Sequence, residues 1–354
     1  MKRNFLAPVY LALAGSLLLG CGKDDREETE ASAHAFDSAQ SEAAVSASFH
    51  EVMDSMSDTN MASSENTAFA LQGGLDVEIS LERECQVLDD KAVVTIARDK
   101  AISWERSNLR IAVSASATID HDITRTWSQE GAAVGCDANH KAAAIDFEGD
   151  LTGYQLDIAV KRSAERSLER TLKRTGETAT HALQSSVDGT RQAKWLSQET
   201  LDDGSISRSR TVSFSVTRND NFVARDGTVR ELSLALETKE ALQVSAIWDS
   251  LSRTRQLLSK RIASGVIKAS HAGRGHVEAS FDDLLMTFTE SSCAVQSGSM
   301  EAKIFAEGST EPARIYNLTA VDGEITVQDV TDPANPVDVE GFDYTPCDRQ
   351  DFSY

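Results

Sequence analysis

Proline is nearly missing from most of this chain. Only five of the 354 residues are proline, and none occurs between residues 9 and 311, where average usage of about 5% would place roughly fifteen. Proline lacks the N–H that a paired strand donates, so it is confined to edges, turns and bulges of sheets. The gap therefore favours long, regular strands that are paired on both sides.

Positive charge is also scarce. Lysine and arginine number 35 against 56 acidic residues, a formal net charge of −21. The acid is concentrated at residues 22–75 (eleven acids, two bases) and 276–354 (sixteen acids, three bases), whereas residues 76–275 carry 29 acids and 28 bases, 19 of them arginine. Duplex nucleic acid is normally bound by a net basic surface. We therefore expect no nucleic-acid partner, an exclusion that is firm for the two ends and weaker for the balanced centre.

A long apolar run occurs only near the N-terminus. Residues 5–19 are mostly apolar and follow Lys2 and Arg3. The run is too short for a comfortable membrane span and is typical of a signal peptide. Because no second run follows, the sequence excludes a polytopic membrane protein.

The apolar run ends in Leu18-Leu19-Gly20-Cys21, which resembles the lipobox of bacterial lipoproteins. The resemblance implies that residues 1–20 are a signal peptide, that Cys21 carries acyl chains such as palmitate, and that the protein is lipid-anchored in the bacterial cell envelope. Two or three acyl chains are enough for stable anchoring. Gly22 stands where an aspartate often retains lipoproteins in the inner membrane, which favours the outer membrane. Whether the protein faces the periplasm or the cell exterior is left open. The alternative is an ordinary signal peptide in which Cys21 is incidental.

Residues 21–68 predict an acidic, flexible tether, because they hold too little apolar surface to offset the entropy of ordering. A short helix over residues 42–57 is expected within it. The helix either docks on the folded body, which we favour, or stays transient. Its proposed apolar stripe consists of Val45, Phe49, Val52, Met53 and Met56.

From Leu75 onward, apolar and polar residues alternate with a period of two. The pattern begins with Leu75, Val77, Ile79 and Leu81, and it recurs at 109–119, 212–216, 232–236, 242–248 and 277–281. Such alternation is typical of antiparallel strands with one buried face. We predict an all-β fold: a large, long-stranded antiparallel sheet over residues 69–290, curved or partly closed into a barrel or half-barrel.

Turns and the C-terminal region complete the expected organisation. Residues 291–354 contain more proline and shorter strands, and form either an acidic C-terminal β subdomain or the closing strands of the same body. The expected hairpin turns lie at Asp188-Gly189, Asp202-Asp203-Gly204, Asp226-Gly227 and Asp322-Gly323.

Residues 161–174 fit either a helix or a strand. A helix that ends at Gly176 would stack side chains that are four residues apart. A strand would place the arginines and the aliphatic residues of this segment on one face. We favour a strand, because similar strings recur elsewhere. The two sets are Arg162, Arg166, Arg170 and Arg174, and Ala164, Leu168 and Leu172.

The arginines themselves have two interpretations. The one we favour is cross-strand pairing with glutamates on the polar face of the sheet. The other is an anion-binding surface formed by Arg162, Arg166, Arg170 and Arg174, which would recognise phosphate or carboxylate groups of an envelope component such as lipopolysaccharide or peptidoglycan. The acidic C-terminal region could bind divalent cations loosely, but we expect it to be a solvated surface.

Four cysteines remain besides Cys21, and in an exported chain they predict two disulfides. Of the three connectivities we favour Cys85–Cys136 and Cys293–Cys347, each of which closes a loop of about fifty residues. The alternative, a zinc site, lacks a Cys-x2-Cys pair. We expect no metal and no cofactor.

No catalytic motif stands out. Asp120-His121-Asp122 is suggestive, but in a strand the two carboxylates point away from the imidazole, and His121 continues the apolar face. His271 and His276 flank a Gly-Arg-Gly turn and could converge on a metal, which we disfavour. No hydrolase, phosphate-loop or metalloprotease motif is present. We therefore expect no catalytic residues and no enzyme.

The leading hypothesis is a non-enzymatic envelope lipoprotein that acts as a structural or binding module. Its expected partners are the membrane, through the anchor, and an envelope glycan, lipid or protein. The alternative is a carrier that holds lipid or another apolar ligand in the concave face of the sheet. At the level of architecture alone the expected sheet resembles the open half-barrels of lipoprotein carriers, and a fold analogy does not transfer function. A hydrolase is the second alternative.

Overall fold

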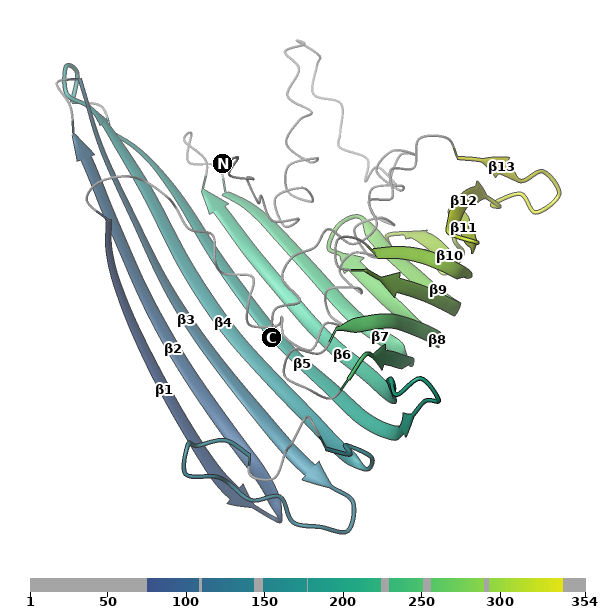
Figure 1. The fold of residues 1–354 in the computed structure, drawn as a ribbon. Helices are drawn as coiled ribbons and strands as arrows, with labels where there is room; N and C mark the ends of the chain where they lie inside the picture. Colours follow the sequence, from purple (N-terminus) through teal and green to yellow (C-terminus); the bar gives the residue numbers. More distant parts are fainter. Residues whose placement is uncertain are drawn as a thin grey trace. The chain divides into compact units, whose positions relative to one another are not determined.

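The computed structural model describes residues 75–107, 110–142, 149–176, 178–223, 229–250, 256–289 and 293–339. As the alternation predicts, the fold is all-β: thirteen strands form one antiparallel sheet in sequence order (Figure 1). Strands β1 and β13 stand at the two ends of that order, so the sheet is open. The strands are β1 Leu75–Leu88, β2 Lys91–Ser107, β3 Ile111–Gln129, β4 Tyr154–Leu172, β5 Thr178–Thr200, β6 Ile206–Val223, β7 Val229–Trp248, β8 Leu257–His271, β9 Gly275–Phe288, β10 Cys293–Ala306, β11 Arg314–Val321, β12 Glu324–Asp329 and β13 Val337–Asp338.

Several predictions from the N-terminus fall outside the described residues. These are the signal peptide, the acylated Cys21, the tether and the helix over residues 42–57. Cys347 lies outside as well. All of them stay predictions.

The positions of proline agree with the reason given for its scarcity. No described strand contains a proline. Pro312 lies between β10 and β11, and Pro333 and Pro336 lie between β12 and β13. Connections do not need the N–H that proline lacks, and the strands do.

The ambiguous segment at 161–174 is a strand as far as Leu172, so the helical alternative is wrong. It belongs to β4, which pairs with β3 along its whole length and with β5 over most of it. The ladders on both sides supply hydrogen bonds to the backbone N–H and C=O groups of β4. This gain outweighs the helix-like spacing of the side chains. Arg174 lies in the turn that follows, where Gly176 adopts a φ of 72°.

The hairpin turns are partly as expected. Asp202-Asp203-Gly204 connects β5 to β6, and Asp322-Gly323 connects β11 to β12. The expected turn at Asp188-Gly189 is wrong, because both residues lie inside β5. Gly189 is buried there, and a Cβ on it would come within 3.0 Å of the Val216 side chain, so close contact between strands explains this glycine. Asp226-Gly227 lies outside the described residues.

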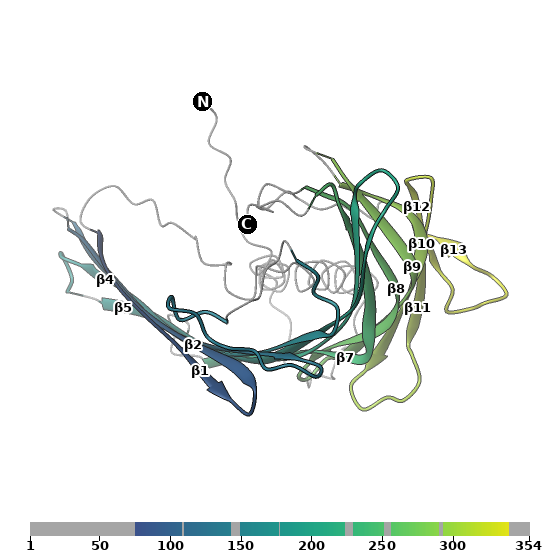
Figure 2. The same ribbon diagram turned by 60° about the horizontal axis from the view of Figure 1, so that its bottom comes forward.

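The described strands divide into two compact units between Gly265 and Val266, within β8. In the later unit, apolar residues of β9 and β10 lie in register on one face and form its core. Its fully buried side chains include Leu284, Met286, Val295, Met300 and Ile304. The earlier unit contains β1–β7 and the first part of β8, and Figures 1 and 2 show β1–β5 side by side within it.

Candidate binding face

The sheet of β1–β7 has two faces of opposite character, which follow from the cross-strand register. Side chains of alternate residues point to opposite faces, and residues in register share a face. On one face the strands place most of their large apolar residues together with every arginine of β1–β7 whose side chain is described. We call it the basic apolar face; its basic residues are Arg83, Arg98, Lys100, Arg125, Arg162, Arg166, Arg170, Arg191, Arg208, Arg210 and Arg218.

The opposite face collects serine, threonine and nearly all the acids in described register, and we call it the acidic face. Its bases in register are lysines: Lys91, Lys161 and Lys194. Asp220 is the one acid in described register on the basic apolar face. The acids of the acidic face are Glu78, Glu82, Glu84, Asp99, Glu105, Asp120, Asp122, Asp157, Glu165, Glu169, Asp188, Glu199, Glu231 and Glu237.

This separation overturns the expectation that the arginines lie on the polar face in register with glutamates. The residues in register with Arg162 are His121 and Val187. Those in register with Arg166 are Ala117 and Leu183. The arginines of β4 share the parity of Ala164 and Leu168, so their own strand already places them on the apolar side.

The register also aligns basic side chains into transverse rows. Arg98 of β2, His121 of β3 and Arg162 of β4 are successive partners. In a second row, Arg125 of β3 and Arg191 of β5 lie on either side of Ile158. An apolar row of Ile96, Ile123 and Val160 separates the two.

His121 is 4% exposed, and its neighbours on the same face, Ile119 and Ile123, are buried as well. Continuation of the apolar face through His121 is therefore confirmed. Asp120 and Asp122 lie on the acidic face, as expected for a strand. The three residues thus do not form one site.

Arg125 occupies an unfavourable electrostatic position. Burial lowers the pKa of its guanidinium, and the positive charge of Arg83 lowers that pKa further. Its Nε is buried and has no hydrogen-bond partner among the described residues. Two cations held close together in partly apolar surroundings repel each other, and an anion between them would relieve that repulsion.

One end of the basic apolar face is covered by the connection between β3 and β4. We call the described part of this connection, residues 130–142 and 149–153, the flap. Val134 and Leu151 of the flap pack on a cluster that includes Trp127 and Trp195. The two indole rings are stacked with centroids 5.7 Å apart, and the guanidinium of Arg210 lies 5.9 Å from the Trp195 ring. This contact places a buried arginine over an aromatic face.

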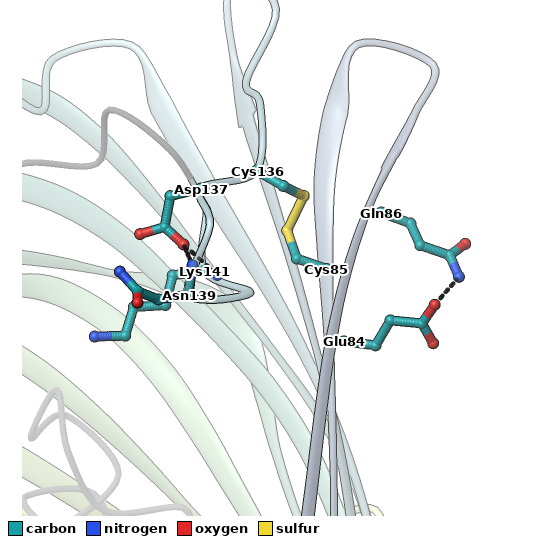
Figure 3. The surroundings of a disulfide bond; sticks show 7 residues. All are labelled: Glu84, Cys85, Gln86, Cys136, Asp137, Asn139 and Lys141. Atoms are coloured by element: carbon teal, nitrogen blue, oxygen red, sulfur yellow. Dashed lines mark hydrogen bonds between the residues drawn. A yellow bond between two sulfur atoms is a disulfide. The ribbon is translucent and has the colours of Figure 1, made fainter.

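Two further connections hold the flap on the sheet. Cys136 of the flap is bonded to Cys85 of β1, as predicted (Figure 3). Arg208 donates from Nη2 to the carbonyl oxygen of Gly149 over 2.8 Å, and from Nε to Oε1 of Gln198 over 2.7 Å. The covered end is therefore tied down by one covalent link and one buried guanidinium.

The flap turns are stabilised by carboxylates. Oδ1 of Asp137 accepts hydrogen bonds from the backbone N–H groups of Asn139 and Lys141 (Figure 3). Oδ1 of Asp150 accepts from the hydroxyl and the backbone N–H of Thr152. These bonds hold the pKa of both carboxyl groups below its ordinary value, led by Lys141 at Asp137 and by the Thr152 hydroxyl at Asp150.

Part of the basic apolar face away from the flap is exposed. Ile79 and Leu81 of β1 are 55% and 62% exposed, and Leu168 of β4 is 41% exposed. Arg166 and Arg170, which flank Leu168 on the same face, are also exposed. Large apolar side chains in water beside arginines mark this part as the stronger candidate for a ligand.

The acidic face carries a broad hollow of about 450 Å³ over β3–β7. Most of its lining residues carry hydroxyl or amide groups, such as Thr126, Thr190 and Gln192. Its carboxylate, Asp157, already accepts hydrogen bonds from Gln155 and Gln192. No histidine or cysteine lines the hollow, so it assembles no nucleophile–base pair of the familiar kinds.

The remaining predicted residues are placed as follows. Cys293 begins β10, and its predicted partner Cys347 is not described, so that disulfide stays a prediction. His276 stacks on Phe305, and Nδ1 of His271 contacts the Ala272 carbonyl oxygen over 2.8 Å. Among the residues that the structure describes, no group of three or more metal-ligating side chains occurs. Within the same described part of the chain, no helix has the length and apolar character to cross a membrane.

Comparisons with protein-family models, with curated proteins and with solved structures find no match to this chain. The function must therefore be argued from the geometry and chemistry of the two faces.

Proposed function

We propose that this chain is a lipid-anchored lipoprotein of the bacterial cell envelope and that its sheet is a non-enzymatic binding module. The anchor is Cys21, as its resemblance to a lipobox implies. The module binds an envelope component through the basic apolar face of β1–β7.

One observation carries the proposal: the separation of arginines from acids between the two faces of the sheet. A purely structural sheet would gain from pairing the two signs across strands. Here the register places Arg166 and Arg170 beside exposed Leu168, with the acids Glu165 and Glu169 on the other side. That arrangement sets cationic side chains beside exposed apolar surface, which suits a partner that is both anionic and apolar.

Site-specific photo-crosslinking in intact cells tests this function. A photoreactive amino acid at Leu168 faces the proposed partner, whereas the same group at Ser167, one residue earlier, faces away. We expect adducts with an envelope component from position 168 and at least about tenfold fewer from position 167. Equal adducts from both positions would refute a binding role for the basic apolar face.

Metabolic labelling with an alkyne analogue of palmitate tests the anchor separately. We expect the wild-type chain to be labelled and a Cys21→Ala variant to lose the label. Equal labelling of both would mean that Cys21 is not the site of acylation.

A second candidate function is carriage of a wholly apolar ligand. The exposed Ile79 and Leu81 on the same face favour it, because aliphatic side chains in water suit an acyl chain. Mass spectrometry of organic extracts of the purified full chain would test it, with a neutral lipid in stoichiometric amount as the expected result. The described residues offer no observation that favours the hydrolase alternative.

A further inference from the structure

The exposed part of the basic apolar face repeats a charged and an apolar side chain along one strand. On β4 this series runs Arg162, Ala164, Arg166, Leu168 and Arg170, in which Ala164 is buried and the last three residues are exposed. Successive residues of one face lie about 6.6 Å apart, so neighbouring arginines of this series are separated by roughly 13 Å with an aliphatic group between them.

The same alternation extends across neighbouring strands. In register with Arg166 lie Ala117 of β3 and Leu183 of β5, and Leu183 is in turn opposite Phe222 of β6. Phe222 is 38% exposed. Arg166 is thus bordered by apolar residues along the strand and across it.

Charge and apolar surface together narrow the class of ligand. A guanidinium forms two parallel hydrogen bonds to a phosphate or carboxylate, which favours an anion at Arg166 and Arg170. A free anion would gain nothing from Leu168 and Phe222, and a neutral lipid would gain nothing from the arginines. A ligand that carries a phosphate next to an acyl chain uses both.

We propose that the exposed part of the basic apolar face binds a lipid whose headgroup phosphate is not neutralised by a cation, with this phosphate on Arg166 or Arg170 and the acyl chain on Leu168 and neighbouring apolar residues. This inference rests on the proposed binding function and names its ligand class. Arg162, closer to the buried His121, borders the same surface. Repulsion by the acids of the opposite face directs the phosphate to this side of the sheet.

Photoactivatable lipids test the inference on the full chain, reconstituted in phosphatidylcholine vesicles. Each vesicle sample contains a trace of one probe with a diazirine in its acyl chain: phosphatidic acid, phosphatidylcholine or diacylglycerol. We expect peptides of β3–β6 to be cross-linked by phosphatidic acid at least about tenfold more than by the other two probes. A double variant, Arg166→Gln with Arg170→Gln, should lose this preference.

Two controls keep the result interpretable. Lys161→Gln removes a cation from the acidic face of the same strand and should leave cross-linking unchanged. Intact Cys85–Cys136 disulfide, detected by non-reducing peptide mapping, reports that each variant has folded. Replacing both arginines with lysine should restore part of the preference, because lysine keeps the charge without the bidentate geometry.

The outcomes separate this inference from the function on which it rests. Equal cross-linking of β3–β6 by all three probes would overturn the phosphate preference and support the apolar carrier. Binding of inorganic phosphate at Arg166 and Arg170 without cross-linking by phosphatidic acid would overturn the lipid and indicate a site for the free anion. Absence of cross-links on the sheet, with adducts from position 168 retained in cells, would refute the lipid ligand while the binding function stands.

Discussion

Cys85 in the edge strand β1 is bonded to Cys136 in the flap, 51 residues later in the sequence. Both side chains adjoin the cluster that contains Trp127 and Trp195. The disulfide thus fastens a connection between two inner strands to the edge of the sheet, and it helps to keep the flap over one end of the basic apolar face.

Removal of this disulfide should destabilise the protein. Loop-closure entropy for a loop of this length predicts about 4 kcal/mol, and measured losses for native disulfides are about 2–5 kcal/mol. We expect a Cys85→Ala, Cys136→Ala double variant to lose free energy of unfolding within that range in chemical denaturation. The reduced double variant is the control, and reduction should cost the variant less stability than it costs the wild-type chain. A variant as stable as the oxidised wild type would contradict the role assigned to the bond.

Arg208 should matter for the flap rather than for the exposed surface. Arg208→Ala leaves the carbonyl of Gly149 and the amide of Gln198 without their donor. Loss of a charged donor to these partly buried acceptors should cost about 2–3 kcal/mol. We expect faster amide hydrogen exchange in residues 149–153. Arg166→Ala, at an exposed position, should change stability by less than about 0.5 kcal/mol; equal effects of the two variants would refute the assignment.

Gly265 is required by the close approach of β8 to β7. Its φ is +137°, and a Cβ would lie 2.6 Å from Cδ2 and 2.8 Å from Cα of Leu242. Overpacking and backbone strain each cost about 1–3 kcal/mol, so Gly265→Ala should lower the thermal midpoint clearly. Gly204→Ala is the matched control, since Gly204 has a φ of +85° but open space around it. A larger loss for Gly204→Ala would show that crowding is not the cause.

Acid should weaken the flap through its two carboxylates. The pKa of Asp137 and that of Asp150 both lie below the ordinary 3.8 in the folded protein because of their hydrogen bonds. A lowered folded-state pKa contributes stability above the unfolded-state value, and that contribution is lost as pH falls through the folded-state pKa. We expect the free energy of unfolding to decline from about pH 5 downward, with a smaller decline for Asp150→Asn. An unchanged slope in denaturation between pH 5 and pH 3 would contradict this.

Much of the fold could be predicted from local pattern. The period of two and the proline gap indicate antiparallel strands, because both report on one strand and its backbone donors. The same local logic places His121 on the apolar face between Ile119 and Ile123. It fails at Asp188-Gly189, where a turn signal lies inside β5 because the contact with Val216 requires a glycine.

Only part of the candidate site could be predicted from local sequence pattern. That Arg166 and Leu168 share a face follows from their spacing once β4 is known to be a strand. The neighbours of Arg166 could not be inferred, because they come from β3 and β5 and depend on the register between strands. A shift of one residue in that register would have placed the acids of one strand opposite the arginines of the next.

The sequence by itself determined the strand content, the side of each strand that is apolar and the presence of arginines on that side, since these depend on residues two positions apart. Only the tertiary structure decided that arginines from six strands gather on one face, that the flap covers Trp127 and Trp195, and that Cys85 meets Cys136. These features join residues tens of positions apart, and the energy that selects them comes from pairing and packing between strands rather than from any local preference.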